Sequence, residues 1–232
     1  MTDITQNIKI VRDKIAQAVQ RSPYANDPQD VTLIAVTKNH GVEAMREAID
    51  DQISVIGENR VQEAESKYDV LGREVSWHLI GHLQSNKAKK AVRLFDLIHS
   101  VDSLALAEAI NKAAGTAGKR QDILLQVNVA QDENKFGLEA DEMMSVAQEV
   151  CKMENIRLCG LMTIAPFYED CELARPVFRK LRELYQELKD ARLEGSDIRY
   201  LSMGMTHDFV VAVEEGANLI RVGTGIFGAR EY

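Results

Sequence analysis

Eight short runs rich in β-branched and other apolar residues recur along the chain, and this repetition limits its possible folds more than any other feature. The runs lie at 31–37, 53–57, 75–81, 96–101, 123–129, 157–164, 198–204 and 218–223. Apolar residues recur with helical spacing between them, so strands and helices alternate, and the strands pair in parallel. An open doubly wound sheet and a closed barrel both satisfy this order. Because no glycine-rich dinucleotide motif follows the first run, the pattern favours an α/β fold of the eight-stranded (β/α)8 TIM barrel type.

The length of 232 residues suits one barrel domain over 1–232. A helix is predicted before the first strand, because apolar residues recur there at helical spacing. They are Ile4, Ile8, Val11, Ile15 and Val19. Charged residues interrupt them, which is not typical of a signal peptide. We expect this extra N-terminal helix to cover an end or a flank of the barrel.

The net charge of −8 argues against broad binding to nucleic acid or to anionic membranes. No segment is long and apolar enough to span a bilayer, so a cytoplasmic location is expected. The three cysteines are odd in number and form no CxxC pair, which predicts neither a disulfide framework nor a zinc site. The five histidines are scattered without a pair at ligand spacing, so no metal is expected.

Two glycine-containing loops are expected where barrels of this kind commonly hold a phosphate, after strands seven and eight. The seventh run leads into Ser202-Met203-Gly204-Met205-Thr206, and the eighth passes through Arg221 into Gly223-Thr224-Gly225. Glycine lets backbone N–H groups approach an anion, and Ser or Thr hydroxyls add hydrogen bonds. Each loop alone is explained by a tight turn or a helix cap. Their joint occurrence at the two expected positions predicts a phosphate site.

Lys38 is a candidate nucleophile because it ends the first strand run. Counting by two puts Ile34, Val36 and Lys38 on one face, which would bring the amine to the barrel mouth above an apolar floor. Such surroundings disfavour the ammonium form and leave the amine able to attack an aldehyde. Arg221 faces inward by the same count. The alternatives are a solvated lysine and an arginine that forms an ion pair at the barrel end.

A lysine, a phosphate site and an inward arginine at one mouth match the aldehyde, phosphate and ring nitrogen of pyridoxal 5′-phosphate. These residues belong to longer stretches that resemble the pyridoxal phosphate homeostasis proteins, also called the YggS or PROSC family. The stretches are Val36–Lys38, Gly57–Asn59 with Gln62 and Glu63, Trp77–Lys87, Leu201–Met205, Arg221–Thr224 and Ile226–Arg230. The resemblance covers nearly the whole chain, and Trp77–Lys87 is its most specific part.

The resemblance implies a fold-type III barrel like the N-terminal domain of alanine racemase, with the cofactor held as an internal aldimine on Lys38. It also implies a role in storing or delivering the cofactor, with apo-enzymes that depend on it as candidate partners, and we expect a monomer. Further site roles follow from position in the motifs. Ser202, Gly204, Gly223 and Thr224 would take the phosphate, Arg221 the pyridine nitrogen, Asn59 would lie near the ring, and Met205 could form a pocket wall.

Three features depart from the commonest family pattern or have no assigned role. Thr206 stands where serine is frequent, which keeps the hydroxyl, and His82 lies where another residue can occur. The segment 134–137 corresponds to a family stretch with lysine and glycine, and its function is open. None of these positions alters the three-point match.

Two enzymatic alternatives remain beside the carrier. An amino-acid racemase would need a positioned acid and base, and the sequence nominates no catalytic residue for that role. The chain ends at Tyr232, just past strand eight, which leaves no room for the second domain that supplies alanine racemase with its tyrosine base. An arginine can only donate to the ring nitrogen, which weakens the electron sink, although alanine racemase also uses one. A Schiff-base aldolase without cofactor is the third reading, and it would be colourless where a cofactor protein is yellow.

Overall fold

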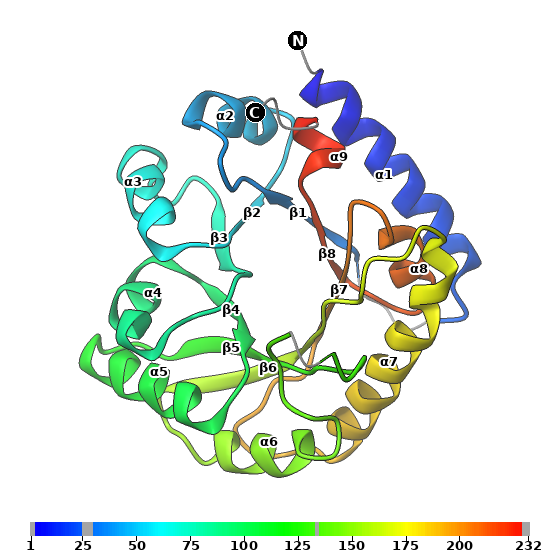
Figure 1. Ribbon diagram of the computed structural model, residues 1–232. Coiled ribbons are helices and arrows are strands. Elements are labelled where there is room, and N and C mark those ends of the chain that lie inside the picture. The colour runs from blue at the N-terminus through cyan, green and yellow to red at the C-terminus, as the bar shows by residue number, and fades with distance from the viewer. Residues whose placement is uncertain (1–2, 25–29, 133–134, 229–232) are drawn as a thin grey trace.

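Eight parallel strands form a closed barrel in the computed structural model, which describes residues 3–24, 30–132 and 135–228 (Figure 1). Neighbouring strands in the chain pair with each other, and β1 pairs with β8 to close the ring. The strands are β1 (Thr32–Val36), β2 (Val55–Glu58), β3 (Ser76–Leu79), β4 (Leu97–Val101), β5 (Gln121–Gln126), β6 (Ile156–Met162), β7 (Tyr200–Met205) and β8 (Leu219–Val222). The predicted barrel is therefore confirmed.

Helices surround the barrel and connect its strands (Figure 1). They are α1 (Ile4–Arg21), α2 (Val42–Asp50), α3 (Val61–Leu71), α4 (Ala88–Leu94), α5 (Leu104–Thr116), α6 (Met143–Cys151), α7 (Arg175–Asp190), α8 (Phe209–Glu214) and α9 (Thr224–Phe227), with 3-10 turns η1 (Ser85–Lys87) and η2 (Cys171–Ala174). Glu58 pairs with Leu79 in the β2–β3 ladder, and α3 begins after it.

The predicted N-terminal helix is present as α1 and covers a flank of the barrel. Its buried side chains are Ile4, Ile8, Val11, Ile15 and Ala18. The helix packs along α8 and α9 (Figure 1). Asp3 caps its start by accepting a hydrogen bond of 2.8 Å from the Gln6 N–H. At the other end of the chain, the Ile226 carbonyl accepts a bond of 2.8 Å from the Asn7 amide, so α1 also holds α9 in place.

The barrel interior has an apolar layer beneath a polar one. The apolar layer consists of Ile34, Val55, Leu97, Leu124, Cys159, Met162 and Leu219. Side chains alternate along a strand, so the next inward residue lies two positions nearer the carboxyl end. On β4 and β8 that residue is polar, His99 after Leu97 and Arg221 after Leu219. The barrel floor is therefore apolar, while the level just below the mouth carries side chains that form hydrogen bonds.

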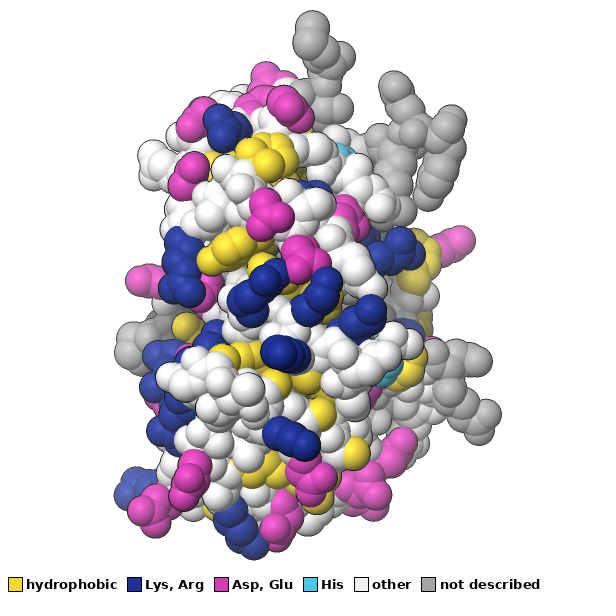
Figure 2. Space-filling model, turned by 90° about the vertical axis from the view of Figure 1, so that its left-hand side faces the viewer, with side chains coloured by type: hydrophobic (Ala, Val, Ile, Leu, Met, Phe, Trp, Pro, Cys, Tyr) yellow, Lys and Arg dark blue, Asp and Glu magenta, His cyan; other side chains and the backbone are white. Residues whose placement is uncertain are grey.

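The outer surface on the flank of α2, α3 and α4 carries many lysines and arginines with acidic residues among them (Figure 2). On this flank, Lys90 and Arg93 of α4 both pair with Glu65 of α3. Such exposed pairs contribute little to stability. Of the helices in the described ranges, none is long and apolar enough to cross a membrane.

Candidate functional site

Lys38 lies two residues beyond β1, at the mouth of the barrel and partly buried. The inward side of its strand carries Ile34, in the apolar layer, as the counting by two requires. A cavity of about 170 Å³ lies beside Lys38, and Asn59 is among the residues that line it. The structure therefore brings together two of the residues singled out from the sequence.

The loop after β8 lies directly beside the end of β1. A side chain added at Gly223 would come 3.4 Å from Val36 Cβ, two residues before Lys38. Farther along, the rings of His40 and Phe227 stack with centroids 4.6 Å apart, which joins the segment after Lys38 to α9. The lysine and the glycine loop therefore share one edge of the mouth.

Thr206 contributes a hydroxyl to the glycine loop. Its Oγ1 accepts from the backbone N–H groups of Gly223 and Gly225, at 3.3 Å each. Gly225 has to be glycine there, because an added Cβ would lie 2.8 Å from Val222 Cγ1. Thr224, between the two glycines, is exposed. Converging N–H groups and hydroxyls of this kind are suited to a phosphate, so the two predicted loops do meet.

The β7 segment has a different geometry from the one expected for a phosphate loop. Gly204 has φ of +91°, and an added Cβ would lie 2.6 Å from Ala212 Cβ and 2.9 Å from Phe209 Cα. This glycine therefore lets β7 pack closely against α8. Met205 is 37% exposed at the rim. It lines an apolar hollow of about 270 Å³ that also includes Phe167.

Arg221 reaches inward below the mouth, and Ser202 is one of its two partners. Its guanidinium donates to the Ser202 hydroxyl and, at 2.8 Å, to the Thr163 carbonyl. The arginine is only 3% exposed. Burial lowers the pKa of Arg221 to about 10, so it remains protonated at neutral pH. The structure therefore places one fixed positive charge under the mouth.

A chain of hydrogen bonds continues from Ser202 across the barrel. The Ser202 hydroxyl lies 2.9 Å from His99 Nδ1, and His99 Nε2 lies 3.0 Å from His78 Nδ1. Because arginine can only donate, Ser202 accepts from Arg221. A neutral His99 ring donates through one of its two nitrogens and accepts through the other. Burial lowers the pKa of His78 to about 4 and that of His99 well below its usual value, so both rings are neutral at pH 7.

These hydrogen bonds give Ser202 two side-chain partners, whereas a phosphate was the expected partner. Its hydroxyl is completely buried and would have to leave both Arg221 and His99 to reach a phosphate. Thr206, at the end of the same predicted loop, has the better position for a phosphate, because its hydroxyl is partly exposed and lies beside Gly223. In the sequence, the scattered positions of His78 and His99 do not indicate that their side chains meet. Counting by two along β4 could have predicted that His99 points inward, as Arg221 does. The contact between His78 and His99 could not be predicted, because it depends on the register between β3 and β4.

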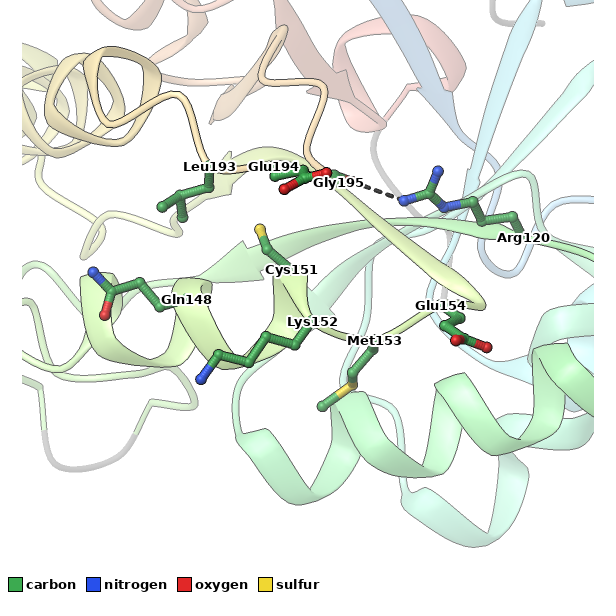
Figure 3. Close-up of a pocket in the computed structure, with 9 residues that line it drawn as sticks. All are labelled: Arg120, Gln148, Cys151, Lys152, Met153, Glu154, Leu193, Glu194 and Gly195. Atoms are coloured by element: carbon green, nitrogen blue, oxygen red, sulfur yellow. Dashed lines mark hydrogen bonds between the residues drawn. The ribbon is translucent and has the colours of Figure 1, made fainter.

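A larger hollow of about 670 Å³ lies at the opposite end of the barrel, between the residues that precede β5, β6 and β7 (Figure 3). Arg120 closes one side by donating to the Gly195 carbonyl at 2.8 Å. Figure 3 shows the Cys151 thiol turned toward Leu193, while the Lys152 side chain points away. In barrels of this type the amino-terminal end serves stability rather than chemistry. The candidate site is therefore the mouth near Lys38.

Comparison with known proteins agrees with this geometry. The alanine racemase N-terminal domain family matches residues 4–231. The pyridoxal phosphate homeostasis protein of Aquifex aeolicus is 40% identical over 228 residues, covering 98% of each chain, and that of Escherichia coli K12 is 35% identical over 237 residues. The chain belongs to the pyridoxal phosphate homeostasis family. The resemblance seen in the sequence is confirmed.

Solved structures of the homeostasis family have the same architecture. PipY of Synechococcus elongatus, solved without PLP, is 38% identical, covers 97% of this chain and superimposes with a TM-score of 0.85. The same protein with PLP bound gives a TM-score of 0.84. Alanine racemase from Clostridium difficile, at 15% identity, matches with a TM-score of 0.75 over 60% of its own length. That likeness shows a shared barrel fold.

Within the homeostasis family fold, the candidate site of this chain is formed by residues that lie far apart in the sequence. No group of three His, Cys, Asp or Glu side chains able to hold a metal ion is found within residues 3–24, 30–132 and 135–228. The predicted open segment 134–137 lies partly outside the described residues. Lys135, at its described end, has its Nζ 3.5 Å from the Ile164 carbonyl.

Proposed function

We propose that this protein binds pyridoxal 5′-phosphate at the barrel mouth and holds it covalently on Lys38. The observation that carries the proposal is the meeting of Lys38 with the Gly223–Gly225 loop and Thr206 at one edge of the mouth, with Arg221 beneath. The cofactor bound by PipY and the names of the curated relatives support the same ligand. We treat residues 1–232 as one binding domain.

The residues present fit this group by charge and by hydrogen-bonding type. The N–H groups of Gly223 and Gly225 already converge on an oxygen, that of Thr206, and would serve phosphate oxygens in the same way. The protonated Arg221 supplies a donor where the pyridine nitrogen needs one. Asn59 and Lys38 line the same adjoining cavity, which supports a role for the Asn59 amide beside the cofactor.

When bound, the cofactor supplies an aldehyde. Lys38 would hold the cofactor through that group, because a lysine amine can condense with an aldehyde and release one water. Arg221 stays protonated, and the neutral His99 and His78 behind Ser202 offer no second charge nearby. A ring nitrogen that only accepts from arginine stays unprotonated, which favours holding the cofactor over stabilising a carbanion. We therefore propose storage and release to apo-enzymes that need the cofactor, with the protein acting as a monomer.

Borohydride reduction followed by peptide mapping tests the covalent attachment. Reduction of the C=N bond should fix a pyridoxyl group on Lys38 and remove the yellow colour of the purified protein. Lys135 provides an internal comparison, because it lies near the same mouth and should stay unmodified at one equivalent of cofactor. Mapping of the pyridoxyl group to another lysine, or a colourless protein after incubation with the cofactor, would contradict the proposal.

A further inference from the structure

A group of three charged side chains lies directly behind Lys38, on the side of β2 and α3. Glu58 ends β2, Glu63 lies in the first turn of α3, and Lys67 follows one turn later. Their side chains are 0%, 21% and 9% exposed, respectively. We call these three residues the Lys67 cluster. It is removed from water yet borders the cavity beside Lys38, which Glu63 helps to line.

Lys67 is the centre of the cluster. Its Nζ donates to Glu58 Oε1, to Glu63 Oε1 and to the Thr37 carbonyl, each at 2.7 Å. An ammonium group has three N–H bonds, so these partners use its full donor capacity. One cation therefore joins the end of β2, the start of α3 and the residue before Lys38.

The cluster holds the backbone on both sides of Lys38. On the near side, the Thr37 hydroxyl donates to Glu58 Oε1 at 2.5 Å, in addition to the bond from Lys67 to the Thr37 carbonyl. On the far side, the Asn39 N–H donates to Glu63 Oε1 at 2.5 Å. Asn39 has φ of +63°, a left-handed conformation that turns the chain just after the lysine. The residues flanking Lys38 are thus both fixed through Lys67.

Docking of α3 does not require the cluster, because the helix also buries Val61, Ala64 and Leu71. The buried carboxylate is costly to the fold. Burial raises the pKa of Glu58 against the opposing bonds from Lys67 and Thr37, and its Oε2 has no hydrogen-bond partner among the described residues. Buried ion pairs are weak sources of stability compared with apolar residues of the same size. The cluster surrounds the backbone next to Lys38, and this position indicates a role other than stabilising the fold.

We propose that Lys67, together with Glu58 and Glu63, is a positioning residue that sets the backbone around Lys38 and so directs the Lys38 amine at the incoming aldehyde. The inference rests on the proposed function, in which Lys38 forms the covalent link. Attack on a carbonyl requires the reacting atoms to be held close and aligned, and a displacement of about 1 Å can slow a reaction about 100-fold. Loss of the cluster should therefore slow attachment of the cofactor.

The test compares Lys67→Met and Lys67→Arg with a control in another ion-pair network. Arg175→Met is the control, because Arg175 likewise binds several carboxylates, including Glu214 and Glu215, but on the outer flank between α7 and α8. Stopped-flow absorbance measures the rate at which each apo-protein attaches pyridoxal phosphate. Hydrogen exchange at the Asn39 amide, measured without cofactor, reports on the backbone directly.

We expect Lys67→Met to slow attachment between about 10-fold and 100-fold and to speed exchange at the Asn39 amide. Lys67→Arg should recover part of the rate, because it keeps a buried cation. Arg175→Met should lower the unfolding midpoint while attaching the cofactor at the wild-type rate. An attachment rate for Lys67→Met that equals the wild-type rate, or that falls no further than in the control, overturns the inference.

Two further results distinguish failure of the inference from loss of folding and from failure of the proposed function. If Lys67→Met does not fold, Glu63→Leu carries the test, since it keeps a side chain of similar size but removes the oxygen that accepts from the Asn39 N–H and from Lys67. Slower attachment by this variant supports the inference, and an unchanged rate overturns it. If borohydride mapping of the wild-type protein shows no label on Lys38, the proposed function fails and the inference fails with it. Correct wild-type labelling with unaffected variants refutes the positioning role alone.

Discussion

Replacing Ser202 or Thr206 by alanine separates two roles that the sequence alone could not distinguish. Ser202 has its hydroxyl completely buried between Arg221 and His99. A hydrogen bond to a charged group contributes about 1.5–3 kcal/mol and a neutral one about 0.5–1.5 kcal/mol. Ser202→Ala should therefore lower the free energy of unfolding by roughly 2–4 kcal/mol. Thr206 is partly exposed and accepts two longer bonds, so Thr206→Ala should cost roughly 1 kcal/mol or less.

For ligand binding we expect the reverse, with the larger effect from Thr206→Ala and the smaller one from Ser202→Ala. Titration of each variant with pyridoxal phosphate and with pyridoxal, which lacks the phosphate, isolates the contribution of the phosphate site. Thr206→Ala should reduce the preference for the phosphorylated form by roughly 10-fold to 100-fold, the equivalent of one charge-assisted hydrogen bond. Ser202→Ala should leave that preference unchanged. The reasoning is refuted if Ser202→Ala keeps wild-type stability in urea and loses the phosphate preference instead.

Three shorter predictions concern other parts of the barrel. The pKa of His78 is about 4 in the folded protein against 6.5 for a free histidine, so the unfolded chain takes up the proton first as pH falls. Stability should drop by roughly 3 kcal/mol from this residue between pH 6.5 and 4, and His78→Gln should flatten the profile of urea midpoints against pH. Gly204→Ala should cost roughly 1–3 kcal/mol, because it strains a backbone at φ of +91° and crowds Ala212, and an unchanged melting temperature would contradict this. Solvent deuterium should enter alanine far more slowly than the ~10 s⁻¹ typical of enzymes, and exchange near that rate would favour the racemase reading.

The strands and the place of Lys38 could be predicted because both follow from local periodicity. Alternation by two placed Ile34 inside the barrel and the lysine at its mouth, without knowledge of any other strand. The glycine loops could be predicted for the same reason, since barrel geometry fixes which ends of β7 and β8 face the mouth. These parts of the site depend on sequence distances of only a few residues.

The partners of the polar side chains could not be predicted, because they depend on how distant strands meet. Ser202 bonds His99, 103 positions away, and no pattern on either strand shows that their side chains share a level of the barrel. Lys67 reaches back 30 positions to Thr37, and the residue spacing of its helix does not indicate that contact. The bonds from the Gly223 and Gly225 N–H groups to Thr206 could not be predicted for the same reason, since the two loops meet only when the barrel is closed.

Closure of the barrel by β8 has a consequence for synthesis of the protein on the ribosome. Until β8 emerges, β1 and β7 are open edges with unpaired backbone groups, the kind of surface through which nascent chains aggregate. The strand that covers both edges is also the one that carries Arg221 and leads into Gly223. A growing chain thus acquires the Gly223–Gly225 loop, the proposed phosphate site, only when its last exposed edges disappear. Capture of the ligand would then report that the chain has finished folding.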